Sequence, residues 1–465
     1  MEPSSALARV VAQDTRAGQV LERGREFRRR YIDPVAAEVD RRMLLDPHYH
    51  PEELVRRGCE YGFLSLPIPA FLGGGGGLSL HSAVLMEELC AGCAGLANIF
   101  GAHYLGISGL LLSFDLNLFD RFLRQVPAAE RRGEPLLFAA AITEPTAGTD
   151  VEDVDLLPKA RLSMGARKVA GGYVLDGRKC FISNGSVARF TMLTCALDRK
   201  RPLESMSGFV VPAGTPGLSV GRVELKLGQR ACHAAELVFE DCFVADDLRI
   251  GTEGGGARLT EVVLAASRAP VAAIATGIAR GAYEAALAFA KQQPDGAGRL
   301  VDRQWVQQAL ADMHASLELG RQAYLEAGAN FDTRVGGPLL GNPAVTETAM
   351  RLSAPLRQSA LGQRLTGSEA FKRATTQQVL TRLAHAPVAA ALGLSSLAKF
   401  SCSDLAVKVC LRALEILGPA GTLERHAVEK RFRDAKLTQI YEGTNQLNRR
   451  AVYKGLIGGG DAWTR

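Results

Sequence analysis

The hydrophobic pattern changes period twice along the chain, and this change constrains the fold more than any other feature. Residues 1–135 carry apolar side chains at helical spacing, most clearly over 16–42 and 78–112. Over 136–255, short runs rich in Val, Phe, Thr and Leu alternate with Gly, Asp and Asn turns. Helical spacing then returns over 256–465. We therefore predict an α+β fold with an N-terminal α-helical domain, a middle antiparallel β domain and a C-terminal α-helical bundle, divided at these limits.

Several local signals refine this pattern. Gly171 and Gly172 separate two strand-like runs and predict a β-hairpin. Five consecutive glycines, 73–77, lack the Gly-Lys-Ser/Thr of a phosphate-binding loop, so we expect a flexible turn between helices. Pro270 lies inside a helical pattern and predicts a kink or a helix start. The Cys90-x-x-Cys93 pair falls on a helix without a second pair, which favours a structural role.

Composition excludes several functional classes. A chain of 465 residues that is 47% hydrophobic can bury a large core. The net charge of +6 suits a small anionic ligand, and without a basic run interleaved with aromatics we expect no nucleic-acid partner. The nine cysteines form no disulfide pattern, which indicates a cytoplasmic protein. We also expect no secretory leader and no membrane span, because no long uncharged apolar run is present.

The motifs with chemical content are one loop, two strand ends and one turn. Pro145 and Gly148 keep the loop 141–150 irregular, so its amides and threonine hydroxyls are free to bind a ligand. The strand ends are 177–185, which finishes in Asn-Gly, and 226–241. In the turn, Glu442 precedes Gly443 after a helix rich in Arg and Lys. For an isolated Glu-Gly pair, a solvated glutamate before a helix-ending glycine is the ordinary interpretation.

Taken together and in this order, the motifs resemble those of the acyl-CoA dehydrogenase family. The family's loop Thr-Glu-Pro-x-Ala-Gly-Ser/Thr-Asp matches 143–150, its strand end Ile-Thr/Ser-Asn-Gly matches 182–185, and its Tyr-Glu-Gly-Thr matches 441–444. The resemblance covers most of the chain and implies the same helix–β–helix fold. It also implies bound FAD, an acyl-CoA substrate and an electron-transfer flavoprotein as electron acceptor.

The resemblance also assigns site residues. The residues expected to contact FAD are Ile142, Thr143, Gly148, Thr149, Phe181, Ser183, Thr444 and Gln446. Phe181 and Ser183 would flank the flavin ring, with Ser183 near N5. The residues expected to contact substrate are Thr149, Arg268, Tyr441, Glu442 and Gly443.

Glu442 is the expected catalytic base. Removal of a proton α to a thioester requires a positioned base and donors at the carbonyl oxygen. In the family this base takes the α-proton, the β-hydrogen leaves as hydride to flavin N5, and a trans-2-enoyl-CoA forms. Some members place the base just before the arginine that aligns with Arg268. Ser267 occupies that position here and cannot serve, which leaves Glu442.

The chain departs from the family where the ADP part of FAD is normally bound. The family's Arg-x-x-Phe-Gly reads Gln293-Pro-Asp-Gly296-Ala, and its Gln-x-x-Gly-Gly reads Glu415-Ile-Leu-Gly-Pro419. A lost arginine–phosphate contact weakens binding. Two explanations remain: a related partner subunit supplies the arginine in a hetero-oligomer, or Arg299 or Arg303 substitutes in a homodimer or homotetramer.

The motifs are compatible with more than one electron acceptor. Glu442 argues against a flavin monooxygenase but is compatible with an oxygen-using acyl-CoA oxidase. A non-enzymatic assembly subunit conflicts with the retained Thr143, Ser183 and Glu442. The stretch 330–385 is longer than the family requires, and could lengthen bundle helices, cover the acyl pocket or form an interface.

Overall fold

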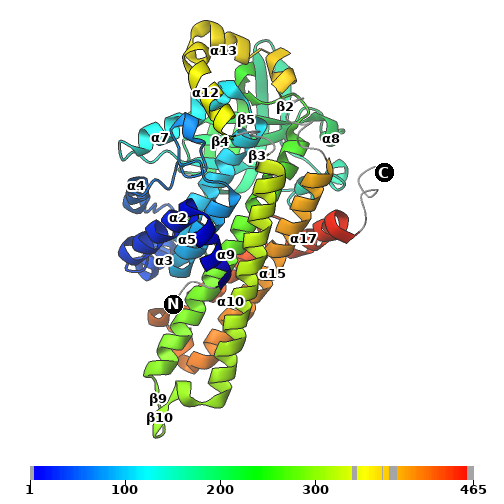
Figure 1. Cartoon of the computed structure of the whole chain (residues 1–465). Coiled ribbons are helices and arrows are strands. Elements are labelled where there is room, and N and C mark those ends of the chain that lie inside the picture. Colours follow the sequence, from blue (N-terminus) through cyan, green and yellow to red (C-terminus); the bar gives the residue numbers. More distant parts are fainter. Residues whose placement is uncertain (1–4, 338–342, 369, 376–384, 458–465) are drawn as a thin grey trace.

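The computed structural model describes residues 5–337, 343–368, 370–375 and 385–457. The strands lie between the two helical regions along the chain, and Figure 1 shows them in the upper half of the molecule, with the long helices extending below. The predicted helix–β–helix order and fold class are therefore confirmed. The N-terminal helices are α1 Ser5–Gln13, α2 Thr15–Phe27, α3 Ala36–Leu45, α4 Glu52–Glu60, α5 Ser79–Ser113, α6 Leu116–Leu118 and α7 Gln125–Glu130. The predicted domain limits at 135 and 255 stay predictions; strands begin at Phe138 and the next long helix begins at Gly256.

The sheet has eight strands in the order β6-β7-β3-β2-β4-β5-β8, with β1 beside β4. Its strands are β1 Phe138–Ala141, β2 Gly165–Val169, β3 Gly172–Ser183, β4 Phe190–Ala196, β5 Met206–Pro212, β6 Leu218–Val223, β7 Ala234–Ala245 and β8 Arg249–Ile250. The hairpin predicted at Gly171–Gly172 is confirmed, with Val169 opposite Gly172. Most pairs are antiparallel, but β4 pairs parallel with β1 and β2. The sheet is therefore mixed, because the long connection from β1 to β4 lets the chain return in the same direction.

The C-terminal bundle is built on three long helices that pack against one another, and α9 and α10 also pack against α5. These are α9 Gly256–Gln292, α10 Gln304–Phe331 and α15 His385–Leu417, followed by α16 Val428–Thr438 and α17 Asn445–Val452. By length and apolarity α5 and α9 could each cross a membrane, but 89% and 83% of their most apolar windows are buried inside the protein. They are core helices, whose small residues allow close packing: a Cβ on Gly277 would lie 2.4 Å from the Glu87 carbonyl oxygen.

One local expectation needs correction, and one of two alternatives at Pro270 is removed. The glycine run 73–77 is ordered, because Gly75 N–H donates to Ser65 O and Gly77 N–H to Leu66 O, at 2.9 and 2.7 Å. Pro270 does not start a helix but lies inside α9. A proline leaves the carbonyl four residues earlier without its helical donor. Here the Ser79 hydroxyl donates to that carbonyl, of Ala266, at 2.8 Å, so α9 tolerates the proline.

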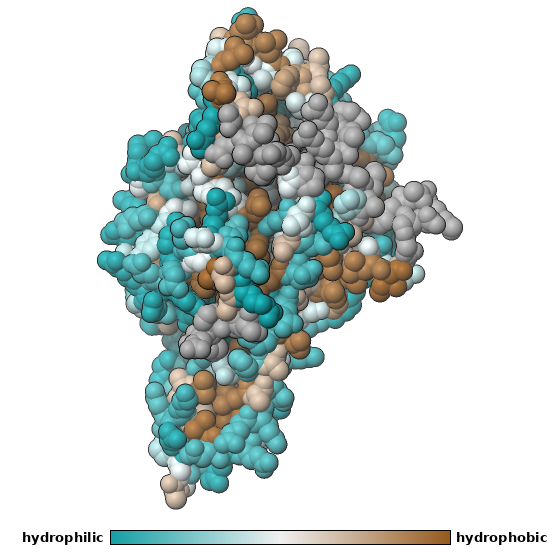
Figure 2. Space-filling model, in the orientation of Figure 1, coloured by the Kyte–Doolittle hydropathy of each residue, from teal (hydrophilic) through white to brown (hydrophobic). Residues whose placement is uncertain are grey.

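The segment between α10 and α15, called the insertion below, leaves the bundle. Its described part comprises α12 Pro343–Gln358, α13 Ala360–Thr366 and residues 370–375; residues 338–342, 369 and 376–384 lie outside the described residues. Figure 1 places α12 and α13 at the top of the molecule, beside the β strands. They do not lengthen α10 or α15. Figure 2 shows apolar side chains over these helices, which carry the exposed Leu352, Leu356, Leu361 and Leu365.

Candidate active site

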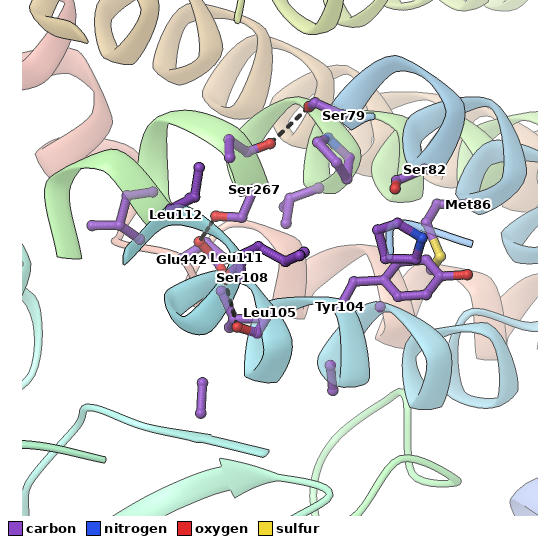
Figure 3. A pocket seen from close by; sticks show the side chains of 18 of the residues that line it. Ser79, Ser82, Met86, Tyr104, Leu105, Ser108, Leu111, Leu112, Ser267 and Glu442 are labelled. Atoms are coloured by element: carbon purple, nitrogen blue, oxygen red, sulfur yellow. Dashed lines mark hydrogen bonds between the residues drawn. The ribbon is translucent and has the colours of Figure 1, made fainter. Parts of the chain in front are cut away.

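A cavity of about 280 Å³ opens between α5, α9 and the β sheet (Figure 3). The helices line it with mainly apolar side chains, including Met86, Leu105, Leu111, Leu264 and Ile274. The sheet and the loop before β2 contribute Ala140, Ile142, Thr143, Phe181, Ile182 and Ser183. Tyr441 and Glu442 also line the cavity. An apolar cavity with a few converging polar groups is typical of a ligand site.

The Glu442 carboxylate enters this cavity from the turn between α16 and α17. Glu442 has φ +55° and Gly443 has φ +75°, both in the left-handed region. That region is unfavourable for a side chain such as glutamate, and strained residues are concentrated at functional sites. The Ser267 hydroxyl on α9 donates a hydrogen bond to the carboxylate at 2.8 Å, as Figure 3 shows. Ser267, which was excluded above as a base, therefore orients the carboxylate.

Buried donors hold the backbone of this turn. Arg268 Nε donates to the Glu442 carbonyl at 3.2 Å, and Lys399 Nζ donates to the Gly443 carbonyl at 2.6 Å. The Asn448 side-chain amide donates to the carbonyls of Gly443 and Thr444, at 2.9 and 3.0 Å. Gly443 has φ +75°, and a Cβ there would lie 2.9 Å from side-chain atoms of Arg268 and Glu152, so another residue would be strained at this position. The turn is thus fixed from several sides.

Four charged groups meet at this point. Burial raises the pKa of Glu442, while the Ser267 hydrogen bond and the Arg268 charge oppose the rise. Burial also raises the pKa of Glu152 to about 7, with Arg268 opposing and Glu442 adding to the shift. Burial and the neighbouring Arg268 lower the pKa of Lys399 to about 7. Groups with such shifts in a cavity are candidates for proton transfer.

On the wall formed by the sheet, Phe181 and Ser183 lie at the end of β3. Phe181 has φ +58° and its side chain is 60% exposed, although the ring lines the cavity. The β3–β7 register shifts between Lys179 and Ile182, which turns Phe181 out of the ladder. An exposed phenylalanine in a cavity favours a planar apolar partner. Together with Ile142 and Thr143, this wall fits the isoalloxazine ring of a flavin.

The remaining predicted residues lie around the cavity without lining it. Gly148 and Thr149 belong to the loop that leads into the short helix η4 Thr149–Glu152. Thr444 caps α17 by accepting from Leu447 N–H at 3.3 Å, and Gln446 is exposed on the same helix. Gly443 belongs to the Glu442 turn, and Arg268 lies behind this turn. The structure therefore brings Ile142, Thr143, Phe181, Ser183, Tyr441 and Glu442 together in one cavity.

Three further residues at the site were not found from the sequence. Glu152 lines the cavity and forms an ion pair with Arg268 at 3.5 Å. Lys399 and Asn448 hold the Glu442 turn. Glu152 follows the 143–150 motif by two positions, so its place in the chain was a usable signal. For Lys399, inside an apolar helix, only the unusual buried lysine could have drawn attention.

The region expected to bind the ADP part of FAD lies elsewhere. Gln293, Asp295 and Gly296 belong to the hairpin β9 Pro294–Asp295 and β10 Gly298–Arg299, which Figure 1 shows at the lower end of α9 and α10. Arg303 donates to Asp295 at 2.5 Å, and Arg299 forms an ion pair with Asp302 at 3.6 Å. Each arginine of this loop therefore has a carboxylate beside it.

Comparisons with known proteins agree with this geometry. The model of the acyl-CoA dehydrogenase N-terminal domain matches residues 16–114, and that of the middle domain matches residues 139–242. The model of the C-terminal domain matches two consecutive ranges, 254–350 and 351–457. The chain is 31% identical to a cyclohex-1-ene-1-carbonyl-CoA dehydrogenase of Geobacter metallireducens, covering 93% of this chain and 96% of that protein. It is 28% identical to an acryloyl-CoA reductase (NADH) of Anaerotignum propionicum, covering 95% of each.

A solved structure shows the same architecture. Butyryl-CoA dehydrogenase from Megasphaera elsdenii superposes with a TM-score of 0.75 at 25% identity, covering 97% of this chain and 99% of that one. The chain belongs to the acyl-CoA dehydrogenase family, whose members are FAD-dependent oxidoreductases that act on CH–CH groups. The expected family, enzyme class and cofactor are thereby confirmed.

Proposed function

We propose that this protein removes two hydrogens from the α and β carbons of an acyl-CoA thioester, with Glu442 as the base that takes the α-proton. One observation carries the proposal: the Glu442 carboxylate and the Phe181–Ser183 wall line the same cavity. A substrate between them would present its α-carbon to Glu442 and its β-carbon to the flavin. Bound FAD would accept the β-hydrogen as hydride.

The chain's own residues account for the proton step. Ionised Glu442 is the base, and the Ser267 hydroxyl holds its carboxylate at 2.8 Å. The nearby Arg268 charge favours the ionised form despite burial. Arg268, Lys399 and Asn448 fix the turn, so that the base is in position before substrate binds. The apolar lining excludes water and suits a short or compact acyl chain.

The test is Glu442→Gln. General-base catalysis contributes about 10²–10⁴-fold, so the variant should lose that factor in turnover with an artificial electron acceptor and keep its flavin absorbance. Glu326→Gln, at an exposed position on α10, is the control and should keep full activity. Unchanged turnover in Glu442→Gln would remove Glu442 from the mechanism. Reoxidation of the reduced protein by air would favour an oxidase over a dehydrogenase that uses an electron-transfer flavoprotein.

We further propose that the chain forms a homo-oligomer in which Arg303 takes the place of the missing FAD arginine. This proposal is supported by the position of Arg303 at the start of α10, where it donates to Asp295 of the hairpin that replaces the family's arginine segment. Protein purified alone should hold one FAD per subunit. FAD bound only when a related subunit is added would support the hetero-oligomer instead.

We also propose a cytoplasmic location. All nine cysteines are free and buried, as expected for a reducing compartment. Cell fractionation tests this proposal, and recovery in an oxidising compartment would contradict it.

A further inference from the structure

The insertion reaches into the protein next to the cavity. Lys372 and Asp115 form an ion pair at 3.4 Å, and both side chains are only 2% exposed. Lys372 Nζ also donates to the Arg249 carbonyl at 2.8 Å, so it links the insertion to the N-terminal helices and to β8. A second pair joins Arg357 of α12 to Asp120 at 3.0 Å, with side chains 7% and 8% exposed.

The two aspartates flank residues that line the cavity. Asp115 follows Phe114, and Asp120 follows Phe119; both phenylalanines are in the cavity wall. Phe114 ends α5 with φ +52°, and Asp115 caps α6 by accepting from Leu118 N–H at 3.2 Å. The two phenylalanine rings contact each other, with centroids 5.5 Å apart. The position of this wall therefore depends on a turn that Lys372 holds from outside.

The location of the wall indicates which part of a substrate would pass it. Figure 3 shows Met86 and Tyr104 at one end of the cavity, and Leu112 with Glu442 at the other. The first end is closed, since Met86 and Tyr104 are 0% and 9% exposed. Because the α-carbon must lie at Glu442, the acyl chain extends toward the closed end. The thioester arm then leaves in the opposite direction, past Leu112 and the partly exposed Phe114.

We propose that the insertion shapes the entrance of the cavity for the thioester arm of the substrate. Lys372, acting through Asp115, keeps Phe114 and Phe119 where this arm passes. Lys372 does not line the cavity and is a positioning residue. The inference rests on the proposed function for the identity of the ligand, but its contacts are independent of Glu442.

The experiment compares Lys372→Met with Arg364→Met, an exposed arginine on α13 of the same insertion. In the purified holoenzyme, Lys372→Met should raise KM for butyryl-CoA about tenfold and change kcat by less than about twofold, because ground-state binding is lost and Glu442 is untouched. KM for hexanoyl-CoA should rise by the same factor, since the acyl end is unaffected. Calorimetry with coenzyme A alone should show a matching increase in Kd. Arg364→Met should match the unmodified protein.

Two further variants separate positioning from simple loss of stability. Asp115→Asn with Lys372→Met removes both buried charges and retains a capping side chain, so KM should return toward its original value. Phe114→Ala leaves the ion pair intact and removes the wall itself, so it should reproduce the KM increase. Three results would each overturn the proposal. The first is an unchanged KM and coenzyme A affinity in both Lys372→Met and Phe114→Ala. The others are an effect that depends on acyl length, and equal losses in kcat and kcat/KM. Absence of acyl-CoA turnover in the unmodified protein would refute the proposed function instead.

Discussion

At the scale of single residues, the site is a carboxylate held ready in a strained turn. Glu442 has a positive φ. Its carboxylate accepts a hydrogen bond from Ser267, and its backbone carbonyl accepts one from Arg268. Each contact joins positions far apart in the chain. The surrounding charges are nearly balanced, since Glu152 and Glu442 face Arg268 and Lys399. Such a cluster is costly to bury and unnecessary for packing, which supports a functional role.

Ser267→Ala should move the pH dependence of turnover to higher pH. The Ser267 hydrogen bond opposes the rise in the Glu442 pKa, so its loss raises that pKa further. Because the base acts when ionised, activity appears only at higher pH. The measurement is the rate of flavin reduction by acyl-CoA across pH. Ser79→Ala is the matched control, because the Ser79 hydroxyl donates its hydrogen bond to the carbonyl of Ala266, the residue before Ser267, and not to Glu442. An unshifted profile in Ser267→Ala would contradict the assigned contact.

Lys399→Met should lower kcat by about tenfold or more without loss of flavin, because the Gly443 carbonyl loses its buried donor and the base is held less firmly. Lys408→Met, at an exposed position on the same helix, should have no effect. Steady-state kinetics together with the flavin spectrum decide the outcome. Equal activity in the two variants would show that the turn is fixed without Lys399.

At the scale of elements, the helices that carry the site are tied together by a buried ionic network. Glu87 of α5 accepts from Arg321 of α10 at 2.8 Å, and from the Tyr324 hydroxyl at 2.5 Å. Arg280 of α9 adds an ion pair at 3.3 Å. Burial alone would raise the pKa of Glu87, but Arg321 and Arg280 outweigh it and lower the pKa to about 2. Three helices therefore depend on one carboxylate.

Glu87→Gln should destabilise the fold by about 3–5 kcal/mol, because removing one member of a buried ionic network leaves the others uncompensated. Glu318→Gln, which removes a partly exposed partner of the same Arg321, should cost less than about 1 kcal/mol. Urea unfolding measures both. A lowered folded-state pKa means that the contribution of Glu87 is present above its unfolded value of 4.5 and is lost as pH falls toward 2. The difference between the two variants should therefore shrink in acid.

The hairpin β9–β10 is the element that replaces the family's phosphate-binding segment. Asp295→Asn removes a negative charge and frees Arg303, so FAD should bind about three- to tenfold more tightly. Asp302→Asn removes the same charge from the same loop, beside Arg299, and is the control. Fluorescence titration of the flavin-free protein gives both affinities. A tighter complex only in Asp302→Asn would assign the role to Arg299.

At the scale of the whole molecule, the cavity exists only because three parts of the chain meet. The sheet supplies Phe181 and Ser183, α5 and α9 supply the apolar walls, and the turn after α16 supplies Glu442. Each part alone exposes apolar surface that the others cover. The insertion adds a fourth part, tied to the end of α5 through Lys372 and Asp115.

Local sequence patterns were enough to predict the order of helices and strands, the hairpin at Gly171–Gly172 and the residue proposed as the base. Those features follow from local periodicity, from turn residues and from motifs that are each a short continuous stretch of the chain. The motif 441–444 was sufficient to single out Glu442 once the loop 143–150 was recognised.

The surroundings of Glu442 depend instead on contacts between distant parts of the chain. Ser267 and Glu442 are 175 positions apart, and Lys372 and Arg249 are 123 apart, so no local pattern relates them. The glycine run was expected to be flexible, but it is ordered because its amides reach the carbonyls of 65–68. The charge cluster around Glu442 and the packing of the insertion also depend on which helices are neighbours. The neighbours of each helix are set by close packing of the whole core, which no local stretch of sequence specifies.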